Sequence, residues 1–130
     1  MIWGLTISYK IIMTIRGCYE NMGSDFDGVL RRLGNEAIIA RVAVKFLNDP
    51  SFSDLKSALA DGRVQDAFRA AHTLKGVCVN LGFDKLYQCS SELTELLRAG
   101  RTDGADQLRA QIEESYAMTV NALTSFRDAQ

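Results

Sequence analysis

The scarcity of proline is the feature of this sequence that most restricts its fold. Pro50 is the only proline among 130 residues, and long stretches of the chain contain no helix breaker at all. An all-β chain needs turns rich in glycine, proline and asparagine at intervals of roughly 8–12 residues, and the sequence does not supply them. The pattern therefore predicts an all-α protein.

Turn signals divide the chain into candidate helices, at residues 14–22, 25–33, 36–48, 51–60, 63–80, 83–99 and 105–127. The helix expected at 63–80 is the most informative, because small and apolar residues follow one another there at spacings of three and four. This spacing is typical of the buried face of a bundle helix. Its members are Val64, Ala67, Ala71, Leu74, Cys78 and Leu81. Since short connections favour antiparallel neighbours, we expect an antiparallel up-down four-helix bundle preceded by one or two short N-terminal helices.

The composition is that of an ordinary soluble domain. Hydrophobic residues make up 47% of the chain, charged residues 24%, and the formal net charge is −1. Without a basic excess to neutralise phosphates, nucleic-acid binding is not expected. The apolar N-terminal run is interrupted by Lys10 and falls short of the ~20 residues that span a bilayer. We predict a cytoplasmic protein with no membrane contact, with residues 1–12 as an extension outside the fold and residues 13–130 as one domain.

Three cysteines, Cys18, Cys78 and Cys89, are present. Their odd number and the lack of a C-x-x-C pair argue against a disulfide framework or a zinc ribbon. Free thiols and no bound metal are the simpler prediction. A metal-binding bundle that uses Cys78, Cys89 and His72 stays open as a less favoured alternative.

His72, the only histidine, follows Ala71 of the buried face by one residue, which is about 100° around a helix. It should therefore lie at or near solvent, with Lys75 one turn away on the same side. A neutral imidazole is a nucleophile near neutral pH, and a lysine can partly offset the charge of a phosphoryl group. Gly76 costs the helix about 1 kcal/mol relative to alanine. It serves either the close approach of a partner's backbone or close packing between helices.

The segment AHTLKGVCVNLG, residues 71–82, resembles the signature of histidine phosphotransfer (HPt) domains. That signature is His-x-x-Lys-Gly followed by a glycine six residues later, here His72, Lys75, Gly76 and Gly82. The flanking sequence over about residues 13–127 is similar to stand-alone bacterial HPt proteins.

The resemblance implies a role for each of these positions. His72 would accept the phosphoryl group, Lys75 would lie beside it, and Gly76 would leave room for the partner. Family members often carry an amide or hydroxyl on the next helix that orients the imidazole. Thr94 is expected to face His72 here, with Ser91 one turn earlier, although many relatives have glutamine at this position.

The same resemblance implies partners and a reaction. The phosphoryl group would pass between His72 and aspartates of response-regulator receiver domains, with a hybrid sensor histidine kinase upstream. The receiver would supply Mg²⁺, and this chain would need no cofactor. A docking patch is expected around His72, formed by Phe68, Arg69, Val79 and Leu81.

The chain is predicted to be a phosphocarrier and not a kinase. It has no G-x-x-x-x-G-K-[ST] loop, and no length remains for an ATP-binding domain once the bundle is built. A bundle complete within one chain favours a monomer. The main alternative is a helical protein-interaction module without phosphotransfer.

Overall fold

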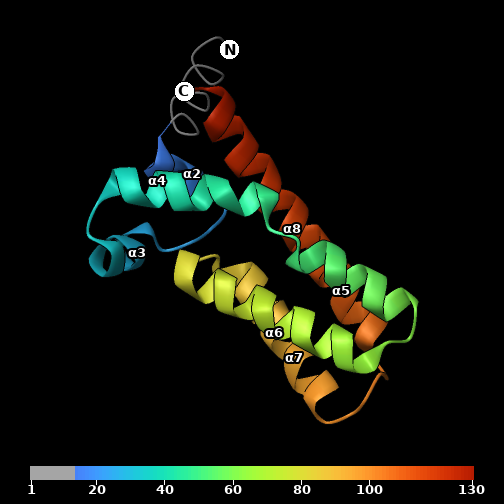
Figure 1. The fold of residues 1–130 in the computed structure, drawn as a ribbon. Coiled ribbons are helices and arrows are strands. Elements are labelled where there is room, and N and C mark those ends of the chain that lie inside the picture. The colour runs from blue at the N-terminus through green and yellow to red at the C-terminus, as the bar shows by residue number, and fades with distance from the viewer. Residues whose placement is uncertain (1–13) are drawn as a thin grey trace.

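The computed structural model describes residues 14–130, which form helices and no strand, so the predicted all-α class is confirmed (Figure 1). The elements are α2 (Ile15–Asn21), α3 (Phe26–Leu33), α4 (Glu36–Lys45), the 3-10 helix η1 (Phe46–Asn48), α5 (Ser51–Ala60), α6 (Val64–Leu81), α7 (Asp84–Arg98) and α8 (Ala105–Asp128). The expected extension, residues 1–12, lies outside the described residues. No described helix is both long and apolar enough to cross a membrane.

Helices α5 to α8 form the predicted up-down four-helix bundle (Figure 1). Consecutive helices pack against each other in the order α5, α6, α7, α8. Side chains close the circle between α8 and α5. The rings of Phe52 and Tyr116 have centroids 4.4 Å apart, and Lys56 Nζ lies 3.4 Å from Glu113 Oε1.

Three helices precede the bundle in the described residues, where one or two were expected. The predicted helix 36–48 also ends earlier, at Lys45, and continues as the 3-10 turn η1. The reason lies at Pro50, since a residue before proline is driven out of the helical region. Asp49 accordingly adopts an extended conformation, and its carboxylate accepts a hydrogen bond from the Ser51 N–H at 2.9 Å.

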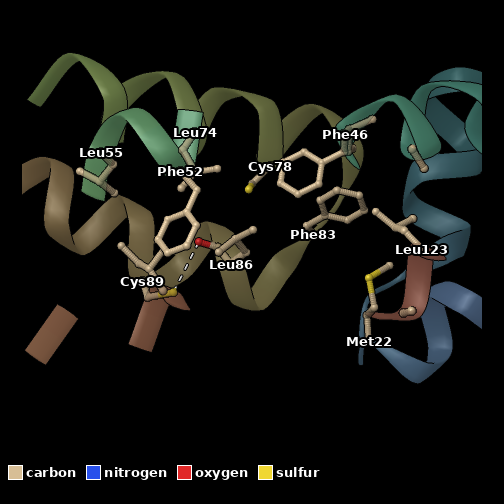
Figure 2. Close-up of a cluster of buried hydrophobic side chains, with 14 of the residues drawn as sticks. Met22, Phe46, Phe52, Leu55, Leu74, Cys78, Phe83, Leu86, Cys89 and Leu123 are labelled. Atoms are coloured by element: carbon tan, nitrogen blue, oxygen red, sulfur yellow. Dashed lines mark hydrogen bonds between the residues drawn. The ribbon is translucent and has the colours of Figure 1, made fainter. Parts of the chain in front are cut away.

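An aromatic cluster joins the N-terminal helices to the bundle. Phe46 and Phe83 meet edge to face with centroids 5.1 Å apart (Figure 2). Tyr19 lies 5.3 Å from Phe26 and 5.7 Å from Phe83, measured between ring centroids. The 24-residue helix α8 contacts α7, α2 and α4. The N-terminal helices and the bundle therefore share one core.

Helices α2 and α3 also hold the C-terminal end of α6. The last carbonyls of a helix have no partner within it, and here side chains from elsewhere supply one. Arg32 donates to the Val79 carbonyl at 2.9 Å, and the Tyr19 hydroxyl donates to the Leu81 carbonyl at 2.6 Å.

Gly82 makes the turn from α6 into α7 possible. Its φ is +73°, and a Cβ at this position would overlap the side chain of Val29 on α3. The last glycine of the signature is thus required both by its backbone conformation and by the close approach of α3. Together these contacts fix the helix that carries His72.

Candidate functional site

Helix α6 presents His72 to solvent. The residues of its inward face, Ala67, Ala71, Leu74 and Cys78, are fully buried, whereas His72 is exposed. Its predicted position outside the buried face is confirmed. His72 is the ninth of the 18 residues of α6, so helical backbone holds it on both sides.

An aromatic ring and a guanidinium lie next to the imidazole. Half-buried Phe68, one turn earlier on α6, has its ring centroid 5.9 Å from that of His72, with 51° between the planes. The guanidinium carbon of Arg98, on α7, lies 5.1 Å from the centroid of the Phe68 ring. Such an arrangement is a cation–π contact, and it brings a second helix to the site.

On the side of His72 that faces α7, a carboxylate lies between two cations. Glu95 Oε2 lies 3.0 Å from Arg98 Nε, and Glu95 Oε1 lies 3.9 Å from Lys75 Nζ. We call Lys75, Glu95 and Arg98 the charged triad. The Lys75 side chain is 27% exposed, and those of Glu95 and Arg98 are 56% and 51% exposed. Pairs this exposed are individually weak, so the triad can rearrange when a new charge arrives.

Gly76 leaves open space one turn beyond His72. A Cβ built on it would meet nothing within 4 Å outside the local helix backbone. The structure therefore gives no support to close helix packing as the reason for this glycine. Val79, a further turn along, is exposed at 44%. The surface that runs from Phe68 past His72 and Gly76 to Val79 is accessible to a partner.

Arg69 lies on the other side of His72, toward α5. It pairs with Asp66 at 3.0 Å, and Asp66 also pairs with Arg63 at 2.9 Å. Arg69 and Thr73 line a polar groove of about 500 Å³ between α5 and α6. Thr73 donates its hydroxyl to the Arg69 carbonyl at 2.9 Å.

The expected contact that orients the imidazole is not formed among residues 14–130, and one residue of the expected docking patch is buried. Thr94 is fully buried, and its hydroxyl donates to the Ser90 carbonyl at 2.7 Å. Ser91 is half-buried, and within residues 14–130 neither side chain hydrogen-bonds the imidazole. Leu81 is buried at 9% exposure, so it offers a partner little surface.

Helix α7 instead brings Glu95 and Arg98 to the site, two residues that the sequence reasoning missed. Thr94 belongs to the inward face of α7 with Ser90, Leu93 and Leu97, all of them buried. Position 95 is about 100° further round the helix. The spacing of Leu86, Ser90, Leu93 and Leu97 marks this buried face in the sequence, and it is the signal that places residue 95, not 94, at its rim.

The cysteines do not join His72. Cys18 and Cys78 are fully buried and Cys89 is nearly so. Burial raises the pKa of the Cys18 thiol to about 12 and also raises the pKa of the Cys78 and Cys89 thiols. No three histidine, cysteine or carboxylate side chains in the described part of the chain are grouped so that they could hold a metal ion. The metal-binding alternative gains no support from this geometry.

Comparison with protein-family models identifies the family to which this site belongs. The family model of the Hpt domain matches residues 49–122, more than half of the 130 residues. The match includes all of α5, α6 and α7, and with them His72 and the charged triad. No curated protein and no solved structure gives a significant match.

Proposed function

Because the chain belongs to the Hpt domain family, whose members carry phosphoryl groups in two-component systems, we propose that His72 is the residue that accepts and donates the phosphoryl group. The observation that carries this proposal is the exposed imidazole on a firmly held helix, beside Lys75 and the open space at Gly76. His72 is also the only histidine in the sequence. A phosphohistidine in this chain therefore has one possible position.

The reaction is a reversible exchange between an aspartyl phosphate and the imidazole. A ring nitrogen of His72 attacks the phosphorus in line with the bond to the aspartate oxygen. The N–P bond forms as the P–O bond breaks, and the carboxylate leaves with the electron pair. Positioning and charge neutralisation supply most of the rate enhancement in such transfers. Lys75, one turn from His72, contributes positive charge for the incoming phosphoryl oxygens.

The receiver domain docks, in this proposal, on the surface formed by Phe68, His72, Gly76 and Val79. Arg69 lies at its polar edge. Transient signalling contacts combine a small apolar centre with a charged rim, and this surface has both. Mg²⁺ and the phosphorylated aspartate belong to the receiver. A hybrid sensor kinase upstream and a monomeric state of this chain are further parts of the proposal.

The direct test is phosphotransfer from a receiver. The full chain and His72→Gln are mixed with a purified receiver domain that has been phosphorylated with acetyl phosphate. The wild-type chain is expected to take up an acid-labile, alkali-stable label, and the variant none. Equal labelling of His72→Gln would reject His72 as the site. A wild-type chain that stays unlabelled with a panel of receivers would favour a plain interaction module.

The variant Lys75→Ala tests whether Lys75 contributes to the rate of transfer without contributing much to stability. We expect transfer to slow by about tenfold, since one positive charge beside the phosphoryl group is lost. The free energy of unfolding should change by less than about 1 kcal/mol, because the pair with Glu95 is long, at 3.9 Å, and its carboxylate is 56% exposed. Rapid-quench kinetics with the phosphorylated receiver measure the rate of transfer, and urea unfolding measures the free energy of unfolding. Loss of the fold would contradict the placement of Lys75.

We also propose that the chain is a carrier without autokinase activity. Incubation with γ-labelled ATP alone should leave it unlabelled, and addition of a sensor kinase with its receiver should permit labelling. Label from ATP alone would contradict this part of the proposal.

A further inference from the structure

We infer that Glu95 is a releasable counter-charge that limits how much of the protein is phosphorylated. This inference rests on the proposed function of His72. In the unphosphorylated protein Glu95 pairs with Arg98 at 3.0 Å and lies 3.9 Å from the Lys75 ammonium. Phosphorylation of His72 would draw both cations toward the phosphoryl oxygens and leave the carboxylate without its partners.

Both cations of the triad are positioned to respond. Lys75 shares the His72 side of α6, since it lies three residues further along the helix. Arg98 sits over the Phe68 ring, which in turn lies beside the imidazole. Arg69 is the other cation on α6 near His72, but Asp66 holds it on the α5 side. Glu95 is thus the acid that neutralises the two cations on the α7 side.

A phosphoryl group adds between one and two negative charges at this place. Lys75 and Arg98 favour the added charge, whereas the Glu95 carboxylate opposes it and also competes for the same cations. Replacing Glu95 by glutamine removes the opposition but keeps the size of the side chain. At equilibrium, a larger fraction of Glu95→Gln than of the wild-type chain should therefore be phosphorylated.

The competing explanation is that Glu95 only ties α7 to α6. In that case its replacement would lower stability and leave the phosphorylated fraction unchanged. Salt distinguishes the two explanations, because mobile ions screen exposed charges strongly at high ionic strength. An electrostatic effect on phosphorylation shrinks in high salt.

The experiment uses phosphoramidate, a small phosphoryl donor, so that no unidentified partner is needed. The P–N bond of the donor breaks, and its electron pair leaves on the ammonia nitrogen. A bond forms between phosphorus and a ring nitrogen of His72, and the displaced ring proton departs with ammonia as ammonium. Donor and ammonium concentrations are fixed, and the ratio of phosphorylated to unphosphorylated chain is read by ³¹P NMR and intact mass.

Three variants of the full chain are compared with the wild type. Glu95→Gln should raise the ratio by about threefold to tenfold at low salt, and the effect should fall toward unity in 1 M salt. Arg98→Gln removes a cation from the same triad and should lower the ratio. Glu113→Gln is the matched control, since Glu113 also joins two cations, Lys56 and Arg109, at 3.4 Å and 3.0 Å, but between α5 and α8. It should leave the ratio unchanged.

The outcomes separate this inference from the proposed function. If the wild type is labelled and Glu95→Gln matches it at low salt, the inference is overturned while His72 keeps its role. An equal rise in Glu113→Gln, or a rise that persists in high salt, overturns it as well. If the wild type takes no label and its fold is intact, both the function and the inference fail. Opposite changes in Glu95→Gln and Arg98→Gln cannot come from a shared loss of structure, and they would support the inference.

Discussion

Two glycines of the same signature serve different purposes at the scale of the residue. Gly76 has ordinary helical geometry and open space where a side chain would be, whereas Gly82 has a positive φ and Val29 against it. The sequence pattern places them only six residues apart. Their physical requirements are nevertheless opposite, and so are the effects expected from alanine.

Gly76→Ala should stabilise the fold and impair the proposed function. Alanine is the better helix former by about 0.5–1 kcal/mol, and its methyl group meets no neighbour here. The midpoint of urea unfolding should therefore rise. The added methyl group stands one turn from His72 on the proposed docking surface, so transfer from a phosphorylated receiver should slow. A lower unfolding midpoint would show that Gly76 serves helix packing after all.

Gly82→Ala should destabilise the protein by at least about 2 kcal/mol. A left-handed conformation costs an L-residue roughly 1–2 kcal/mol, and the new methyl group would also displace Val29. The free energy of unfolding from urea titration measures the loss. A variant as stable as the wild type would contradict the close approach of α3 to this turn.

The sequence predicts the exposure of His72 but not which residue of α7 lies beside it, as Thr94 and Glu95 show. The exposure of His72 followed from its place next to a regular buried face on its own helix. The partner across from it depended on the register between two helices, and an error of one position turns a side chain by about 100°. Thr94 is consequently in the core and Glu95 at the rim.

At the scale of the helices, the predicted ranges agree with the structure to within one or two residues over most of the chain. Periodicity and turn residues are local signals, and they suffice for boundaries such as 51–60. The 3-10 turn before Pro50 was not anticipated, nor was the attachment of α2 and α3 to the end of α6. That attachment depends on residues about sixty positions apart, Tyr19 and Leu81, which periodicity does not relate.

Tyr19→Phe tests this attachment. The variant keeps the ring but removes the hydroxyl that donates to the Leu81 carbonyl, and leaving a buried carbonyl unpaired costs about 1–3 kcal/mol. Urea unfolding should show a loss in that range. Tyr87→Phe is the control, because Tyr87 is half-buried and its hydroxyl bonds no residue within 14–130. Equal losses in the two variants would mean that the hydrogen bond contributes nothing specific.

At the scale of the whole molecule, the buried thiols make stability depend on alkaline pH. The pKa of the Cys18 thiol rises from an ordinary 9.0 to about 12 because burial disfavours the thiolate. In the unfolded chain the thiol ionises at its ordinary pKa. Its contribution to stability is therefore complete below pH 9 and is lost as the pH rises from 9 toward 12.

We expect the Cys18 thiol to lower the free energy of unfolding by about 1 kcal/mol between pH 9 and pH 10. Urea titrations at pH 8, 9 and 10 measure it. Cys18→Ala starts from a lower stability because it leaves a cavity, but its pH dependence should be shallower than that of the wild type. Identical slopes for the two proteins would mean that Cys18 does not keep its proton in the folded state.

Because α2 and α3 pack over the turn at Gly82, a truncated protein that lacks them should not fold well. The region matched by the family begins at residue 49, yet Tyr19, Phe26 and Phe46 of the aromatic cluster come before it. A fragment from residue 49 onward would expose Phe83 to water and remove two hydrogen-bond donors, Tyr19 and Arg32, from the C-terminal end of α6. The region that the family model matches is thus smaller than the unit that shares one core, and we expect fragments cut at its border to aggregate.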